Sequence, residues 1–264
     1  MKMAQINGLN VHYADEGAKD GSVIVFANSL GTDLRVWDPI TPLLPEGIRV
    51  IRYDKRGHGL TDAPDGDYYM GDLVQDAVAL LDHLGIRDAL FVGLSIGGVI
   101  AQGLAAERPD LLRGVVLSNT APKIGTGEMW QERIATVRAK GIAALADPIL
   151  ERWFSKSFRS ERAVDLAGWR HMLTRTPADG YAACCAALAE TDLRDSTAGL
   201  RLPALVIAGS EDGSTPPDLV REMAESIEGA RFELIRGAGH IPCVEAPETY
   251  ARLVGDFAKE IGLV

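Results

Sequence analysis

A strand, a tight turn with a serine at its apex and a helix follow one another near residue 95, and this pattern constrains the fold most. The apolar run Ala89–Val92 predicts the strand, Gly93-Leu94-Ser95-Ile96-Gly97-Gly98 is the turn, and Val99–Ala106 predicts the helix. The spacing matches Gly-x-Ser-x-Gly, a turn that holds its serine in a strained backbone conformation. Glycines at 93 and 97 lack the Cβ atoms that would crowd such a turn.

The position of Ser95 suits a nucleophile. The helix that begins behind it offers free backbone N–H groups and a positive dipole end, which stabilise an oxyanion. Short Gly-x-Ser-x-Gly strings also occur by chance in glycine-rich turns. The nucleophile hypothesis therefore requires an acid and then a histidine further along the chain, in that order.

Both residues are present after later strands. An acidic loop, Gly209-Ser210-Glu211-Asp212-Gly213, follows the apolar run 204–209, and Gly237-Ala238-Gly239-His240 follows the run 231–235. Loops at the carboxyl ends of parallel strands form the ligand-binding edge of an open sheet. The order predicts Ser95, an acid and His240 as a catalytic triad, with Asp212 or Glu211 as the acid.

The chemistry gives each group a role. A serine hydroxyl needs a base to take its proton as it attacks, and an imidazole such as that of His240 can do so. The acid would fix the imidazole tautomer and stabilise the imidazolium. Two backbone N–H groups should hold the oxyanion: that of Ile96, and that of Leu30 in the loop after the strand ending at Ala27.

The rest of the chain alternates strands and helices. A hairpin is predicted over residues 3–15, further strands over 22–27, 49–54, 114–118, 204–209 and 231–235, and helices over 34–44, 70–84, 217–226 and 247–261. Alternation of this kind predicts an α/β fold whose mostly parallel sheet is flanked by helices.

The alternation stops between residues 122 and 196, where only helical patterns occur. These cover residues 128–140, 142–154, 161–174 and 180–189. We predict a helical lid inserted at 122–196 into a core made of residues 1–121 and 197–264. Of the tryptophans in this insertion, Trp130 is the candidate for a pocket, and Trp153 and Trp169 are expected to pack within the lid.

Composition excludes several classes of protein. The net charge of −10, with no basic cluster, argues against nucleic-acid binding, and no apolar stretch is long enough to span a membrane. An anionic ligand would need a local cation. Three cysteines, two of them adjacent, form no disulfide framework, no Cys/His spacing suggests a zinc site, and no signal peptide is visible. We therefore expect a cytoplasmic protein without metal or cofactor; no sequence feature indicates an oligomeric state.

The serine turn, the order of the three residues and the helical insertion together resemble the α/β-hydrolase fold over nearly the whole chain. Arg52-Tyr53-Asp54-Lys55-Arg56-Gly57-His58-Gly59 is similar to that superfamily as well, and the family pattern favours Asp212 as the acid. Most members carry His-Gly at the oxyanion loop. Here the loop reads Asn28-Ser29-Leu30-Gly31-Thr32-Asp33, which with Trp37 resembles the 3-oxoadipate enol-lactonases.

Segments next to and within the insertion carry the same resemblance. These are Ser118-Asn119-Thr120-Ala121, Ile124-Gly125 with Trp130, Ala144-Leu145-Ala146-Asp147 leading to Arg152-Trp153-Phe154, and Gly180-Tyr181-Ala182 with Cys185. The resemblance implies hydrolysis of 3-oxoadipate enol-lactone through an acyl-enzyme on Ser95. The substrate is an anionic small molecule, and Arg133 and Arg138 in the insertion are the candidates for binding its carboxylate.

Two alternatives remain open from the sequence. A related carboxylesterase or a cofactor-free perhydrolase would keep Ser95, Asp212 and His240 and differ in the lid. A non-catalytic ligand receptor on the same fold would also be compatible with an intact triad. Dehalogenases and epoxide hydrolases are disfavoured, since those relatives attack with a carboxylate where this chain has Ser95.

Overall fold

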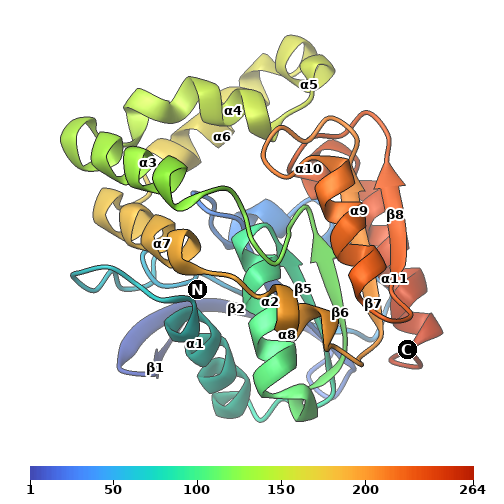
Figure 1. Ribbon diagram of the computed structural model, residues 1–264. Helices are drawn as coiled ribbons and strands as arrows, with labels where there is room; N and C mark the ends of the chain where they lie inside the picture. The colour runs from blue at the N-terminus through green and yellow to red at the C-terminus, as the bar shows by residue number, and fades with distance from the viewer.

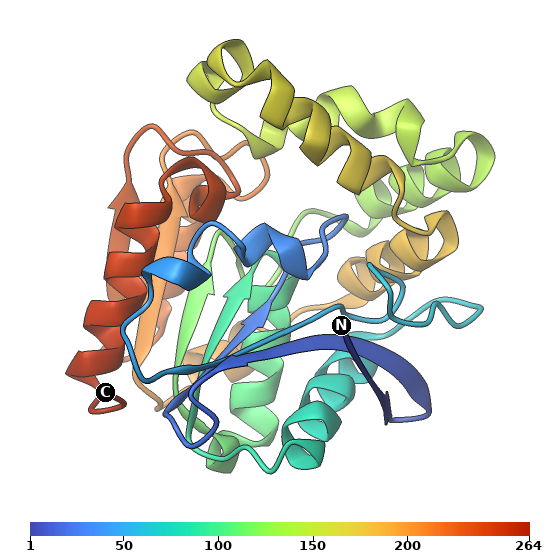
Figure 2. The ribbon, with the colours of Figure 1, turned by 180° about the vertical axis from the view of Figure 1, so that it is seen from behind.

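The computed structural model describes all 264 residues, and its centre is a sheet of eight strands (Figures 1 and 2). The strands are β1 (Lys2–Ile6), β2 (Leu9–Gly17), β3 (Val23–Ala27), β4 (Arg49–Tyr53), β5 (Ala89–Leu94), β6 (Leu112–Ser118), β7 (Ala204–Gly209) and β8 (Arg231–Ile235). They lie in the order β1-β2-β4-β3-β5-β6-β7-β8. The pairs β1–β2 and β2–β4 are antiparallel and all other pairs are parallel.

The predicted strands are confirmed, including the hairpin of β1 and β2. Every residue of β5 and β7 is buried, as expected for parallel strands covered on both faces. Because β3, β5, β6 and β7 are parallel neighbours, the loops after them meet at one edge of the sheet.

Helices cover both faces of the sheet. The helices α1 (Met70–His83), α2 (Ile96–Glu107), α8 (Arg194–Ala198) and α9 (Pro217–Ser226) lie over the face turned to the viewer in Figure 1. The opposite face carries α10 (Pro242–Glu245), α11 (Pro247–Glu260) and the 3₁₀ turns η1 (Leu34–Trp37) and η2 (Thr41–Leu43), seen in Figure 2. A further 3₁₀ turn, η3 (Pro109–Leu111), precedes β6.

The segment between β6 and β7 contains no strand, as predicted. It forms α3 (Gly127–Lys140), η4 (Ile142–Leu145), α4 (Ala146–Trp153), α5 (Lys156–Glu161), α6 (Ala163–Thr174), α7 (Ala178–Glu190) and α8. Helices α3 to α7 lie over the carboxyl ends of the parallel strands (Figure 1). One contiguous core of 83 buried apolar residues includes side chains of both the sheet and these helices, so the insertion is packed onto the sheet rather than tethered to it.

Four details differ from the sequence prediction, and one of them is the short helix α5, which the sequence did not indicate. Residues 34–44 form the two short turns η1 and η2 instead of one helix, because Pro42 has no N–H to donate and its ring blocks a continuous helix. The predicted helix over 142–154 is split into η4 and α4. The chain after β6 also contains α8, which the sequence did not indicate and which packs against α2 and α9 of the core.

None of the helices is both long enough and apolar enough to cross a bilayer.

Candidate active site

Ser95 lies at the junction of β5 and α2 in a strained backbone conformation. Its φ is 59° and its ψ is −121°, in a region that residues with a Cβ rarely adopt. Its N–H donates to the carbonyl of Ser118 at 2.9 Å. A Cβ added at Gly93 would lie 2.2 Å from the Gly97 carbonyl oxygen, and one added at Gly97 would lie 2.1 Å from that of Ala27. The turn therefore requires glycine at both positions, as the motif predicted.

The acid and the histidine lie together beside this turn. Asp212 is in the loop after β7 and His240 is in the loop after β8, and His240 Nδ1 is 2.8 Å from Asp212 Oδ2. Both side chains are buried. Ser95 and His240 line the same cavity. The structure thus brings together the three residues that the sequence order selected.

Asp212 is fixed by hydrogen bonds to both carboxylate oxygens. Oδ1 accepts from the backbone N–H groups of Ser214 and Thr215 at 2.7 and 3.0 Å. Oδ2 accepts from Thr215 Oγ1 and from Asn119 Nδ2 at 2.7 and 2.8 Å. Burial opposes the charged form, but His240 and these donors outweigh it and hold the pKa of Asp212 below its usual range. The carboxylate that faces the imidazole is therefore ionised.

Glu211, the alternative acid, points elsewhere. Its Oε2 accepts from the backbone N–H of Lys156 at the start of α5, at 3.1 Å. The structure favours Asp212 as the partner of His240.

Asn119 is a site residue that the sequence analysis did not assign a role. It follows β6 with a φ of 46°, and its side-chain amide donates to Asp212 and, at 3.2 Å, to the carbonyl of Gly239 next to His240. Its position directly after a strand that neighbours β5 is the signal that could have identified it.

The two candidate oxyanion donors lie at the same cavity as Ser95. Ile96 is the first residue of α2, so its N–H has no acceptor within the helix. Leu30 lies in the loop after β3 and lines the cavity with Ser29 and Ser95. The N–H of Leu30 donates to no backbone carbonyl. This arrangement agrees with the prediction, although the role of both donors remains a prediction.

Buried hydrogen bonds hold the loop that carries Leu30. The N–H of Gly31 donates to His58 Nε2 at 2.9 Å, so this ring nitrogen is unprotonated. Burial, followed by the charge of Lys55, lowers the pKa of His58 well below its ordinary value and keeps the ring neutral. His58 therefore shapes the loop that carries Leu30.

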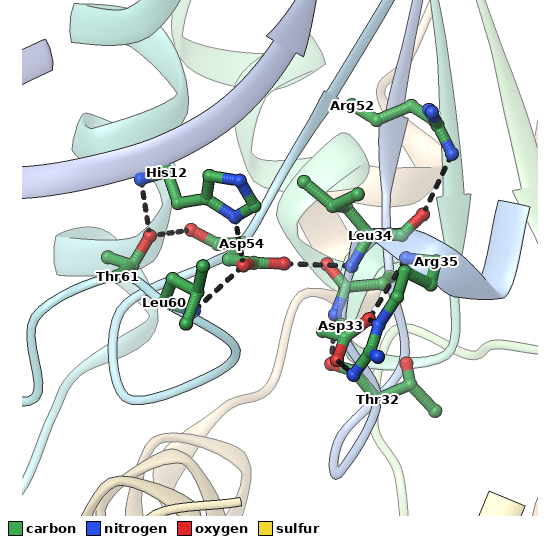
Figure 3. Close-up of polar contacts among 10 residues, drawn as sticks. His12, Thr32, Asp33, Leu34, Arg35, Arg52, Asp54, Leu60 and Thr61 are labelled. Carbon is green, nitrogen blue, oxygen red and sulfur yellow. Dashed lines mark hydrogen bonds and ion pairs between the residues drawn. The ribbon is translucent and has the colours of Figure 1, made fainter. Parts of the chain in front are cut away.

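Asp54, at the end of β4, supports the far side of the same loop (Figure 3). Its Oδ1 accepts from the N–H of Leu34 at 2.8 Å, and its Oδ2 accepts from the N–H of Leu60 at 2.9 Å. His12 Nδ1 lies 2.7 Å from the same Oδ2. A Cβ at Gly59 would lie 2.0 Å from that oxygen, which explains the glycine. Asp54 thus has a structural role behind the site.

The cavity at Ser95 is small, with a volume of about 70 Å³. Its walls come from the oxyanion loop, the triad loops and the inserted helices: Ser29, Leu30, Ser95, Ile124, Gly125, Met129, Trp130, Arg133, Arg152, Trp153, Tyr181, Leu188, Ser214, Thr215 and His240. Trp130 lines this cavity, as predicted. Trp153 lines it too, so the expectation that it packs within the lid is incomplete; it is the last residue of α4, and its carbonyl accepts from the N–H of His240 at 2.8 Å, which holds it beside the triad. Trp169 does pack within the insertion, 6.0 Å from Phe154.

The two candidate arginines lie in different environments. Arg133 lines the cavity, with its guanidinium carbon 4.8 Å from the centre of the Trp130 ring. Arg138 lies five residues further along α3, about one and a half helical turns, where it forms an exposed ion pair with Asp67 at 2.6 Å. The selection of Arg138 as a candidate for binding the substrate carboxylate is therefore not supported. It does not line the cavity, because its position on α3 carries it to the surface. Arg152 also lines the cavity and was not predicted.

A larger cleft of about 580 Å³ lies on the other side of the oxyanion loop, between Asp33, Asp54 and residues 168–176 of the insertion. It contains no member of the triad. No group of three or more His, Cys, Asp and Glu side chains is arranged to hold a metal ion.

The geometry suits acyl transfer. It combines a serine on a strained turn, a buried histidine oriented by a carboxylate, and two backbone N–H groups beside the serine, which are the parts that attack on an ester carbonyl requires.

Comparison with known proteins agrees with this description. Residues 22–247 match the family model of the alpha/beta hydrolase fold. The chain is 38% identical to 3-oxoadipate enol-lactonase 2 of Acinetobacter baylyi, across 94% of this chain and 93% of that protein. It is 36% identical to 3-oxoadipate enol-lactonase 1 of the same organism, across 93% and 91%.

Among solved structures, the enol-lactonase from Burkholderia xenovorans LB400 superposes with a TM-score of 0.95 and 40% identity, covering 98% of this chain and 100% of that one. Two relatives named 3-oxoadipate enol-lactonase and one solved structure described as an enol-lactonase thus match almost the full length of the chain. The chain belongs to the α/β-hydrolase fold family and, within it, to the family of the 3-oxoadipate enol-lactonases.

Proposed function

We propose that this protein hydrolyses 3-oxoadipate enol-lactone to 3-oxoadipate through an acyl-enzyme on Ser95. The observation that supports the proposal is the cavity that Ser95, His240, Leu30 and Arg133 all line. Nucleophile, base, oxyanion donor and a cation for a carboxylate are all present in one small space.

In the first half-reaction Ser95 Oγ attacks the lactone carbonyl while His240 takes the hydroxyl proton. The carbonyl oxygen becomes an oxyanion between the N–H groups of Leu30 and Ile96. The bond from the acyl carbon to the ring oxygen then breaks, and the ring oxygen leaves as an enol after receiving the proton from His240. An enol is a better leaving group than an alkyl alcohol, and it stays tethered to the acyl chain.

In the second half-reaction His240 takes a proton from water as the water attacks the acyl carbon. The ester bond to Ser95 Oγ breaks, and His240 returns the proton to that oxygen. Asp212 remains an ionised carboxylate throughout and stabilises the imidazolium, which its hydrogen bonds and lowered pKa support.

The lining of the cavity supports an anionic substrate. Arg133 forms no ion pair with a carboxylate of the protein and stacks on Trp130, so its guanidinium is available for the free carboxylate of the lactone.

The test is steady-state kinetics of the purified protein on the enol-lactone and on p-nitrophenyl acetate. We expect a kcat/KM at least about 100-fold higher for the lactone, because the ester lacks the carboxylate and the enol leaving group. An equal or higher value for p-nitrophenyl acetate would refute the lactonase proposal and indicate a general carboxylesterase. Absence of turnover with tight retention of the lactone would indicate a receptor.

A further inference from the structure

Lys55 is a buried cation for which the proposed reaction has no explicit role. It lies in the loop after β4 and is 2% exposed. Its Nζ donates to the backbone carbonyl of Ser29 at 2.6 Å and to that of Asn28 at 3.4 Å. Both acceptors belong to the loop that carries the candidate oxyanion donor. A charged group buried against two carbonyls needs an explanation, because the desolvation of an ammonium is unfavourable.

The carbonyl of Ser29 and the N–H of Leu30 belong to the same peptide unit. The chain contains no cis peptide bond, so the two dipole ends point in opposite directions. The Ser29 oxygen also accepts from Thr32 Oγ1 at 3.0 Å and from the Thr32 N–H at 3.3 Å. Three donors thus fix the carbonyl on the buried side, and this orients the Leu30 N–H in the opposite direction.

A cation at the oxygen also changes the electronic state of the peptide. Hydrogen bonds to a carbonyl polarise the amide and make its N–H a stronger donor, and the effect is larger when the donor is charged. We propose that Lys55 is a positioning residue that orients and polarises the Ser29–Leu30 peptide so that the Leu30 N–H stabilises the oxyanion. The inference rests on the proposed attack by Ser95, but not on the identity of the substrate.

The groups around Lys55 set the pH range in which this support operates. Burial lowers the pKa of Lys55 to about 8, and Cys184 of α7, Asp54 and Asp33 act in the opposite direction. Burial raises the pKa of Cys184 to about 12, so it is a neutral thiol at pH 8. His58 is neutral because its pKa is lowered. The ammonium form of Lys55 therefore prevails below about pH 8 and is lost above it.

The test compares Lys55→Met with Thr32→Val. The first variant keeps most of the unbranched side chain and removes the charge; the second removes one neutral donor to the same oxygen. The assay is kcat/KM for p-nitrophenyl acetate, which reports acylation. Complete loss of one oxyanion donor lowers the rate roughly 100- to 1,000-fold, so we expect a loss of about 10- to 100-fold for Lys55→Met and at most a few-fold for Thr32→Val.

Two further measurements separate polarisation from a merely structural role. The kcat/KM of the wild-type protein should fall above about pH 8, and Lys55→Met should lack this alkaline decrease. In addition, 1,1,1-trifluoro-2-butanone forms a tetrahedral oxyanion on a serine, whereas 2-butanone does not. Lys55→Met should weaken the inhibition by the trifluoro ketone in parallel with kcat/KM and leave the inhibition by 2-butanone unchanged.

The inference is overturned if the wild-type profile shows no decrease between pH 7 and pH 9.5, a result that needs no variant to fold. It is also overturned if folded Lys55→Met keeps kcat/KM within about three-fold of the wild-type value, or if this substitution weakens the inhibition by both ketones equally. The lactonase proposal fails by a different result, namely a wild-type kcat/KM for the lactone that is no higher than that for p-nitrophenyl acetate.

Discussion

Ser95 is held in an unfavourable backbone conformation by its neighbours on both sides. Its φ of 59° combines with tight contacts at Gly93 and Gly97, so the turn cannot relax without moving β3 or α2. Strain of this kind typically amounts to about 1–3 kcal/mol and persists only where the surrounding structure enforces it. The hydroxyl is thereby directed into the cavity at the expense of stability.

A pair of substitutions at this residue tests that view. Ser95→Ala removes the nucleophile and keeps the strain, whereas Ser95→Gly removes both. We expect both variants to fold and to lose hydrolysis by several orders of magnitude, because the oxyanion donors and substrate binding alone retain only a small part of the catalysis. Ser95→Gly should be more stable than Ser95→Ala by about 1 kcal/mol, since relief of strain exceeds the entropic penalty of glycine. Thermal and urea unfolding measure the difference. Lactone hydrolysis close to the wild-type rate in either variant would contradict the assignment of the nucleophile.

Single residues could be predicted from the sequence where a local pattern carries the information. Ser95 follows from its turn, and His240 and the acid follow from their order after strands. The sequence could not show that Asn119 hydrogen-bonds to Asp212, because that contact depends on β6 lying beside β7 in the sheet. It could not separate Arg133 from Arg138 either, since both lie on α3 and only the packing of the helix decides which one faces the cavity.

Among the elements, α4 is bound directly to the triad loops through its carboxyl end. The carbonyl of Trp153 accepts from the N–H of His240 at 2.8 Å, and that of Arg152 accepts from the N–H of Gly213 at 3.2 Å. The inserted helices are therefore part of the support of His240 and Asp212, and not only a cover over the cavity.

Glu245 of α10 completes this support. Its Oε1 accepts from the N–H of Gly239 at 2.7 Å, and its Oε2 accepts from Ser155 Oγ at 2.5 Å and from the Ser155 N–H at 3.1 Å. Burial raises the pKa of Glu245, so its position is unfavourable for a carboxylate unless these donors are present.

Replacing Glu245 by alanine should therefore affect stability and catalysis together. The variant leaves the donors at Gly239 and Ser155 without an acceptor, which typically destabilises by about 1–3 kcal/mol. We expect a similar loss in urea unfolding and a lower kcat, because the loop before His240 is released. Glu248→Ala is the matched control, since Glu248 lies exposed at the start of α11. Equal effects of the two substitutions would show that Glu245 has no special role.

The sequence located helices and strands well where the hydrophobic pattern was long. The sequence located the breaks between neighbouring helices less well. The predicted helix over 161–174 is α6, which begins at Ala163, whereas the short helix α5 before it was not predicted. Arg162 lies between the two helices at φ −119° and ψ 48°. No glycine or proline marks that break. Short helices such as α8 likewise carry too few apolar positions to define a period.

At the scale of the whole molecule, a net charge of −10 would repel an anionic substrate. Only a local cation can make the cavity favourable for the carboxylate of the lactone. The net charge alone implies this requirement, and Arg133 lines the cavity.

Arg133→Met should raise KM for the lactone about 10-fold or more and leave kcat/KM for the neutral p-nitrophenyl acetate within a few-fold. A charge-assisted hydrogen bond contributes about 1.5–3 kcal/mol, which sets the expected size. Arg138→Met removes the same charge from the same helix and is the matched control; because Arg138 is exposed and paired with Asp67, it should leave KM unchanged. Identical effects of the two variants would mean that only the net charge matters.

Ionic strength separates the field of the whole protein from the contact at Arg133. Raising NaCl from about 0.01 M to about 1 M shortens the Debye length from about 30 Å to about 3 Å. The long-range repulsion by the acidic surface is then screened, whereas a guanidinium in contact with a carboxylate inside the cavity is screened much less. We expect kcat/KM for the lactone to rise a few-fold with salt and kcat/KM for p-nitrophenyl acetate to stay constant. A decrease for the lactone would show instead that the substrate meets a net attractive field on its approach, with arginines at the cavity outweighing the acidic surface.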